Sequence, residues 1–180
     1  MILRGKAVIL RPLQMQDAPR FFLWLNDPDV NKFLSIRKVT LGAEMVWIRA
    51  TLKVKPQQVF AIDTKDGVHI GACAIRIGNK HHRSGGFGIS IGDKKYWGKG
   101  LGTEAMQLLI AYGFENLKLH RIELDVYDYN KRAIALYKKL GFKKEGILRE
   151  HNFYNGKFHN AIHMAILDRE MKRSDYDSKR

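Results

Sequence analysis

The segment from residue 96 to residue 105, YWGKGLGTEA, has the composition of a ligand-binding loop. Three glycines and one lysine stand directly before a run of good helix formers. A helix N-terminus carries unpaired N–H groups and about half a positive charge. Glycines let the backbone approach a phosphate closely, and Lys99 adds a counter-charge. The pattern therefore indicates a cradle for a pyrophosphate group.

Two known phosphate-binding loops and a plain structural turn compete for this segment. The Walker A pattern, G-x-x-x-x-G-K-[ST], is absent. Gly100, Gly102 and Ala105 do fit the dinucleotide pattern G-x-G-x-x-A, and Asp125 stands about twenty residues further on, where such folds place a ribose-binding acid. In those folds the strand runs directly into the first glycine, whereas GDKKYW here separates the strand-like FGISI from the loop. This context argues against a dinucleotide site, and the structural turn stays open.

The residue types that form thiol or metal centres are poorly represented. Cys73 is the single cysteine, so the chain has no internal disulfide and a reducing, cytoplasmic compartment is expected. Its setting, IGACAIRI, predicts a buried packing residue, because a reactive thiolate needs an electropositive and partly exposed site. His81-His82-Arg83 has no cysteine or acid at ligand spacing and is interpreted as a loop. No metal site is predicted.

Four helices are predicted by apolar residues that recur at positions i, i+3, i+4 and i+7. The four stripes are Ala18, Phe21, Phe22, Leu25; Ala43, Val46, Trp47, Ala50; Ala105, Leu108, Leu109, Tyr112; and Ala133, Leu136, Tyr137, Leu140. Asp17, Thr40 and Asn130 are typical N-cap residues ahead of their helices, and Gly141 is a typical C-terminal stop.

Strand-like stretches alternate with these helices. They cover residues 7–11, 58–63, 68–77, 87–91, 121–127, 143–150 and 157–167. Asp66-Gly67 joins two of them as a hairpin turn. The strands on either side of the third helix are joined by a crossover, so they should run parallel. The sequence thus predicts a mixed α/β (α+β) domain, with a mostly antiparallel sheet of six to seven strands and four helices.

Length and charge set the outer limits of function. A chain of 180 residues with 45% hydrophobic residues suits one globular domain. No stretch approaches the ~20 apolar residues of a membrane span, so no membrane partner is expected. The formal net charge of +14 favours an anionic partner, such as RNA, a ribosomal surface or an anionic cofactor, without naming it.

Two motifs in the second half resemble those of the GCN5-related N-acetyltransferases. They are Trp97-Gly98-Lys99-Gly100-Leu101-Gly102, which is similar to Q/R-x-x-G-x-G/A, and Asn130, Ala133, Tyr137, Gly141, Phe142, which match N-x-x-A-x-x-x-Y-x-x-x-G-F. The opening VILRPLQMQDAPRFFLWLND and the closing EGILREHNFYNGKFHNAIHMAIL resemble the branch of ribosomal-protein N-terminal and spermidine acetyltransferases. The resemblance covers residues 7 to about 168, which implies one acetyltransferase domain (1–168) and a basic tail (169–180).

The resemblance implies that acetyl-CoA is the co-substrate and lies in a slot where the central parallel strands splay apart. The residues implied to contact it are Ser90, Ile91, Trp97, Gly98, Lys99, Gly100, Leu101, Gly102, Thr103, Asn130 and Tyr137. Trp97 departs from the Gln or Arg usual in the family, so the backbone donors rather than this side chain are expected to bind. Asn130 is also expected to cap its helix.

The resemblance also implies that Tyr137 gives a proton to the departing thiolate, which a phenol of pKa ~10 can do. Its place on an apolar stripe keeps a core role open. The base is less defined, because the 86–91 strand holds no carboxylate. Water could relay the proton to one of four residues. They are Glu123 and Asp125, which are preferred, and Asp128 and His120.

The acceptor amine is open between two classes. A free α-amine of pKa ~8 needs less help than a lysine-type or polyamine amine at ~10.4, so the missing carboxylate favours a protein N-terminus. Asn160 stands where N-terminal acetyltransferases often carry Asp and is reminiscent of the spermidine enzymes. A CoA- or nucleic-acid-binding module is the non-enzyme alternative. Relatives often pair through their last strands, so a homodimer is also implied.

Overall fold

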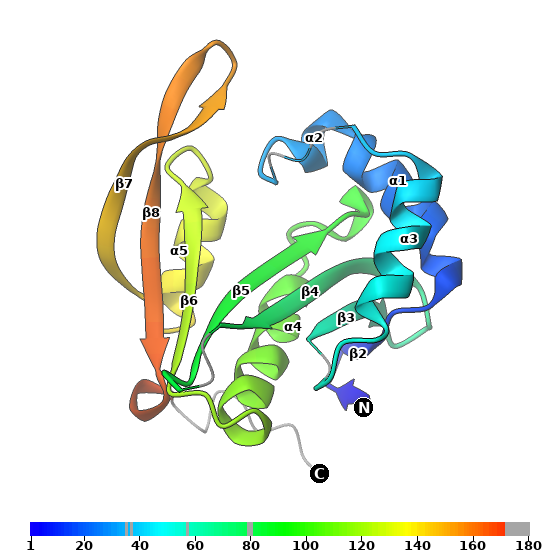
Figure 1. Ribbon diagram of the computed structural model, residues 1–180, viewed down its shortest axis with the longest axis horizontal. Helices are drawn as coiled ribbons and strands as arrows, with labels where there is room; N and C mark the ends of the chain where they lie inside the picture. Colours follow the sequence, from blue (N-terminus) through cyan, green and yellow to red (C-terminus); the bar gives the residue numbers. More distant parts are fainter. Residues whose placement is uncertain (35, 37, 57, 79–80, 172–180) are drawn as a thin grey trace.

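Figure 1 shows the chain in a computed structural model, which describes residues 1–34, 36, 38–56, 58–78 and 81–171. Within them, one sheet has the strand order β1-β2-β3-β4-β5-β6-β8-β7. The strands are β1 (Leu3–Arg4), β2 (Val8–Pro12), β3 (Val59–Thr64), β4 (His69–Ile77), β5 (Ser84–Ile91), β6 (Arg121–Tyr127), β7 (Lys143–Tyr154) and β8 (Lys157–Leu167). Most of the predicted basic tail, 172–180, lies outside the described residues.

The α-helices of the described chain are as follows. They are α1 (Ala18–Asn26), α2 (Pro28–Asn31), α3 (Leu41–Thr51), α4 (Leu101–Ala111) and α5 (Lys131–Lys139). The predicted mixed α/β class is confirmed, but the predicted numbers of strands and helices were too small. A two-residue strand such as β1 and a four-residue helix such as α2 are shorter than the periods that reveal such elements in a sequence.

The predicted parallel pair of strands, β5 and β6, is confirmed, and it splays. The two strands pair only at Ser84↔Arg121, Gly85↔Ile122 and Gly86↔Glu123. Beyond these three rows β5 continues to Ile91 on its ladder with β4, and β6 continues to Tyr127 on its ladder with β8. Figure 1 shows the two arrows diverging upward from their common base. The sheet therefore has a wedge-shaped gap at its centre.

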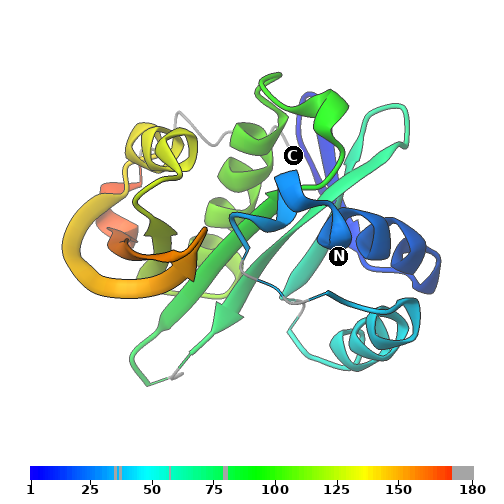
Figure 2. The ribbon, with the colours of Figure 1, turned by 90° about the horizontal axis from the view of Figure 1, so that it is seen from above.

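Helices cover the two faces of the sheet differently, as Figure 2 shows from above. The larger core cluster joins α4 and α5 to one face, and its strand residues include Ile75, Leu124 and Val126. A smaller cluster joins α1 and α3 to the other face through residues such as Phe21 and Ile48. Alternate residues of each strand point to opposite faces. The face of any strand residue can therefore be read from the cluster that its neighbours join.

The predicted helix at α3 and its N-cap Thr40 are confirmed, but the apolar stripe that predicts the helix is not its buried face. Val46 and Trp47, which belong to that stripe, are 66% and 42% exposed. Glu44 and Ile48 are the buried residues of the helix instead. Apolar residues occur all around LGAEMVWIRAT, so periodicity alone could not choose the inner face. Burial raises the pKa of Glu44.

A buried ion network fastens the start of α1 to the sheet. Arg11 donates to the two carboxylate oxygens of Asp17 at 2.9 and 2.8 Å, and to Asp63 at 2.6 Å. Asp17 precedes α1, as predicted, but its carboxylate does not cap that helix and instead accepts from Arg11 and from the Gln14 N–H. Burial by itself would raise the pKa of Asp17, yet these hydrogen bonds hold it below its ordinary value.

Candidate functional site

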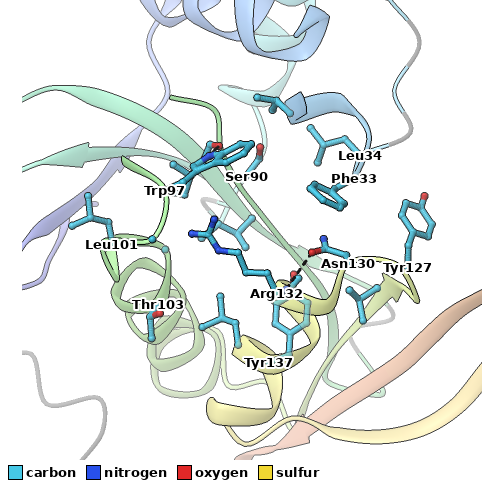
Figure 3. A pocket seen from close by; sticks show the side chains of 18 of the residues that line it. Phe33, Leu34, Ser90, Trp97, Leu101, Thr103, Tyr127, Asn130, Arg132 and Tyr137 are labelled. Carbon is cyan, nitrogen blue, oxygen red and sulfur yellow. Dashed lines mark hydrogen bonds between the residues drawn. The ribbon is translucent and has the colours of Figure 1, made fainter. Parts of the chain in front are cut away.

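A cavity of about 810 Å³ occupies the gap between β5 and β6. It extends from the glycine-rich loop, across the first turn of α4 and the inner side of α5, to the segment that follows α2 (Figure 3). Of the predicted site residues, those that line it are Ser90, Ile91, Trp97, Gly98, Gly100, Leu101, Gly102, Thr103, Asp125, Asn130 and Tyr137. Lys99 and Glu123 do not line it.

The glycine-rich loop has the backbone of a phosphate cradle. Gly98 and Gly100 both have φ of +80°, a left-handed conformation that glycine adopts at little cost. Gly100 directly precedes α4, so the N–H groups of Leu101, Gly102 and Thr103 lie in the first turn, where a helix offers no carbonyl acceptor. These donors, together with the helix dipole, suit a pyrophosphate.

The cationic side chain that faces the cavity near this loop is not the lysine predicted from the sequence. Trp97 Nε1 donates to the Ile91 carbonyl at 2.7 Å, which ties the loop to the end of β5. Lys99 extends over the Tyr96 ring, 5.3 Å from its centroid. Arg132, which sequence reasoning missed, projects from α5 into the cavity toward Trp97, 5.9 Å from that ring (Figure 3). Arg132 is therefore better placed than Lys99 to neutralise a phosphate.

Tyr137 and Asn130 bring α5 to the cavity. Tyr137 is only 8% exposed, and its ring lies 5.9 Å from that of Phe142. Burial raises the pKa of Tyr137 to about 12, so the phenol keeps its proton at neutral pH. Asn130 Oδ1 accepts from the Ala133 N–H at 3.2 Å and caps α5, as predicted. Both a structural and a cavity-lining role thus belong to each residue.

Of the four predicted bases, Asp125 alone lines the cavity. Its neighbours on β6, Leu124 and Val126, join the core cluster beneath α4 and α5. Asp125 therefore points to the opposite face, where its Oδ1 lies 2.7 Å from His163 Nδ1. Glu123 is held by Arg121 at 2.7 Å, outside the cavity lining.

The other two predicted bases are engaged elsewhere. Asp128 accepts from the Asn160 N–H at 3.1 Å, and His120 lies 3.1 Å from Asp168. The interpretation of Cys73 is confirmed, because it is buried and desolvation raises the pKa of its thiol.

The other end of the cavity is built by residues that sequence reasoning missed. They are Val30, Phe33, Leu34, Arg76, Tyr127 and His151. Tyr129 links two of them, since its ring stacks at 6.0 Å from Phe33 and 5.4 Å from Tyr127. These residues come from segments far apart in sequence, so no sequence motif could predict that they lie together.

No ligand-like cluster of three or more His, Cys, Asp or Glu occurs among the described residues. In the same part of the chain, no helix is long and apolar enough to cross a membrane.

The family described as acetyltransferase (GNAT) domain matches residues 7–143. The chain belongs to the GNAT family of acetyltransferases. The resemblance drawn from the glycine loop and the Asn130–Phe142 motif is thereby confirmed, and the chain is an N-acetyltransferase that uses acetyl-CoA.

The GNAT proteins similar to this one include an uncharacterized N-acetyltransferase and a spermidine acetyltransferase. An uncharacterized N-acetyltransferase, p20, from Bacillus licheniformis is 32% identical over 166 residues, covering 89% of this chain and 93% of that protein. Spermidine N(1)-acetyltransferase of Escherichia coli (strain K12) is 41% identical over 105 residues, but the match spans only 58% of this chain and 56% of that enzyme.

A crystal structure also matches the fold of this GNAT protein. Spermidine N-acetyltransferase from Vibrio cholerae, in complex with CoA and spermine, superposes with a TM-score of 0.86 at 25% identity, covering 92% of this chain and 98% of that one. The residues of the present cavity fit acetyl-CoA. The first-turn donors of α4 suit its pyrophosphate, and β5 beyond Gly86 has no ladder partner on its β6 side, where a pantetheine chain can pair.

Proposed function

We propose that this GNAT acetyltransferase acetylates the α-amine of a protein or peptide by direct attack. Acetyl-CoA supplies an acetyl thioester, so the acceptor nitrogen forms the new C–N bond while the C–S bond breaks. The acceptor loses one proton in this reaction, and the departing thiolate gains one. No enzyme nucleophile is required, which agrees with a Cys73 that is buried away from the cavity lining.

Tyr137 is the proton donor in this proposal. Its phenol lines the cavity and holds its proton at neutral pH, because its pKa is raised to about 12. The same dry surroundings also raise the basicity of a thiolate, since burial disfavours the charged form of either group. Because burial raises both pKa values, it does not by itself widen the gap between the phenol and the thiolate that takes its proton.

Asp125 is the proton acceptor in this proposal. It lines the cavity from the face of β6 opposite to the core that contains Tyr137. Acid and base thus approach the thioester from opposite sides of the splayed strands. A free α-amine has a pKa of ~8, so one exposed carboxylate, acting directly or through water, can remove its proton.

The charge of the residues that line the cavity favours a peptide over a polyamine as the acceptor. Among the cavity's described lining residues Asp125 is the one carboxylate, while Arg76 and Arg132 are cationic. A polyamine brings several ammonium groups, each of which needs an anionic or acceptor partner when it leaves water. A peptide brings one ammonium group and neutral amides. The net charge of +14 further supports a protein acceptor that lies beside RNA, such as a ribosomal protein.

Polyamine acetylation is the second candidate. It is favoured by the similarity to the spermidine enzymes of Escherichia coli and Vibrio cholerae. A polyamine could place one amine at Asp125 and its remaining ammonium groups against the ring faces of Phe33 and Tyr127.

A turnover assay that detects free CoA tests both candidates. N-terminal peptides with several different first residues are compared with spermidine, for wild type and for Tyr137→Phe. We expect turnover of at least one peptide, and a fall in kcat of about 10²- to 10⁴-fold in the variant, the usual contribution of a positioned proton donor.

The control is Tyr112→Phe, which alters another buried tyrosine that packs against Phe60 and does not line the cavity. It should turn over at the wild-type rate. Turnover of spermidine with no peptide would move the enzyme to the second candidate. Equal rates for the wild type and Tyr137→Phe would remove Tyr137 as the proton donor.

A further inference from the structure

Open space lies beside the cavity between Arg76 and Asp125, over two glycines that are not among the lining residues. Three adjacent strands align Arg76 on β4 with Gly86 on β5, and Gly86 with Glu123 on β6. Two residues further along β5 and β6, on the same face, stand Gly88 and Asp125. A Cβ atom built on Gly86 or Gly88 would meet no atom within 4 Å, so the space above both glycines is open.

Arg76 faces this open space. Its neighbours Cys73 and Ile75 join the core beneath α4, whereas Ala72 packs with the cluster of α1 and α3. By alternation Arg76 therefore lies on the same face as Asp125, and both line the cavity. The side chain is exposed, and none of the ion pairs among described residues involves Arg76. Its charge is thus available to a ligand.

The separation of the two charges suits one small acceptor. Neighbouring strands lie about 4.8 Å apart, so the backbones of β4 and β6 are about 10 Å apart across Gly86. Extended peptide advances about 3.5 Å per residue. Asp125 lies two residues further along β6 than this row, past the last pair of β5 and β6, so its backbone is farther than about 10 Å from that of Arg76. The long Arg76 side chain and two or three extended residues of an acceptor can together bridge this separation.

Apolar residues line the other end of the cavity. Phe33 and Leu34, from the segment after α2, lie on the side of Ser90 and Tyr127 (Figure 3), four residues along β5 and β6 from the row that contains Gly86. A carboxylate at Arg76 would therefore meet an exposed guanidinium and not an apolar pocket. A guanidinium also binds a carboxylate through two parallel hydrogen bonds, which a single ammonium cannot do.

We propose that Arg76 binds a carboxylate of the acceptor, so that the preferred substrate is a peptide N-terminus with an acidic residue at its second or third position. This inference rests on the proposed function and names its substrate class. The same guanidinium repels the extra ammonium groups of a polyamine. A short peptide could offer its C-terminal carboxylate in place of an acidic side chain, because the chemistry of the contact is the same.

The test measures kcat/KM on peptides that differ in one residue. Peptides with an amidated C-terminus carry Glu, Gln or Lys at the second or third position, and a tripeptide with a free C-terminus is added as a separate arm. Wild type is compared with Arg76→Gln and Arg76→Glu. The charge-matched control is Arg49→Glu, on the exposed side of α3 and away from the cavity lining.

We expect wild type to prefer Glu over Gln at least tenfold, mainly through KM. Arg76→Gln should abolish the preference, and Arg76→Glu should reverse it toward Lys and increase spermidine turnover. Arg49→Glu should behave as wild type. A preference shown by the free tripeptide alone would assign the contact to a terminal carboxylate.

Two results would overturn the inference. Equal kcat/KM for the Glu, Gln and Lys peptides would reject it while leaving peptide acetylation intact. Turnover of spermidine without any peptide would reject the proposed function together with it. Thermal unfolding of each variant shows that it is folded, and the exposed position of Arg76 predicts no change in midpoint.

Discussion

At the scale of single residues, side chains of the same chemical type have different surroundings, and therefore different expected roles, in and beside the cavity. Asp125 and Glu123 lie two positions apart on one face of β6, yet Asp125 alone lines the cavity. Glu123 is neutralised by Arg121, whose guanidinium also holds Glu145 at 2.9 and 2.5 Å. The two carboxylates therefore allow a matched comparison.

We expect Asp125→Asn to lower kcat/KM for peptide acetylation about 10²-fold, in the range of a lost general base. Glu123→Gln should change it by no more than a few fold, because Glu123 does not reach the acceptor. Steady-state rates from pH 6 to pH 9 test this, since an amide cannot take a proton at any of these values. A larger loss in Glu123→Gln than in Asp125→Asn would exchange the two roles.

A second residue-scale prediction concerns the cation that accompanies the cofactor. Arg132 extends into the cavity, whereas Lys99 stands over the Tyr96 ring. We expect Arg132→Ala to raise the KM for acetyl-CoA about tenfold, as for a charged hydrogen bond worth roughly 1.5 kcal/mol. Lys99→Ala should leave it within about twofold. Isothermal titration with CoA measures the same difference without turnover, and equal affinities would contradict it.

At the scale of elements, the sequence predictions were most accurate for features formed by residues that are close together in the sequence. The loop at 97–102 and the helix of Asn130 and Tyr137 are continuous in sequence, so their motifs carried both their structure and their place in the cavity. The parallel pairing of β5 and β6 followed from the crossover through α4.

Features that depend on tertiary packing were missed. Arg76 and His151 reach the cavity only because β4 neighbours β5 and because β7 returns beside β8. The inner face of α3 depends on what packs against Ile48, which periodicity cannot reveal in a helix that is apolar on every side. Both misses have one cause, since the neighbours of an element in space are not its neighbours in sequence.

At the scale of the whole molecule, the two halves of the sheet share one core cluster but differ in their polar contacts and ladders. The half from β1 to β5 carries the ion network of Arg11, Asp17 and Asp63, and the half from β6 to β7 carries long antiparallel ladders. Phe153 and Phe158 are exposed on the hairpin of β7 and β8. Pairing of two copies through these last strands stays a prediction.

We expect Asp17→Asn to destabilise the protein by about 1.5–3 kcal/mol, the cost of weakened charged hydrogen bonds, because it removes one of the two carboxylates that hold the part-buried guanidinium of Arg11. The pKa of Asp17 is lower in the folded state than its unfolded value of about 3.9. Its stabilisation is therefore present above that value and disappears as the pH falls through the folded pKa.

Urea unfolding of wild type and Asp17→Asn at pH 7 and near pH 3 measures this change. Asp29→Asn is the control, since Asp29 is exposed and pairs at the surface with Lys94. It should cost no more than about 1 kcal/mol. A difference between wild type and Asp17→Asn that is as large near pH 3 as at pH 7 would contradict the pH dependence.

The splay of β5 and β6 also bears on how the protein avoids self-association. An unpaired strand edge is a template on which another chain can add a strand, and proteins blunt or cover such edges. Beyond Gly86 the sheet has two such edges, but each faces the other across a cavity that Phe33, Leu34 and α5 enclose. The gap that admits a cofactor thus also shields these edges from the strands of other molecules. The unpaired parts of β5 and β6 therefore add no exposed edge on which the protein could aggregate.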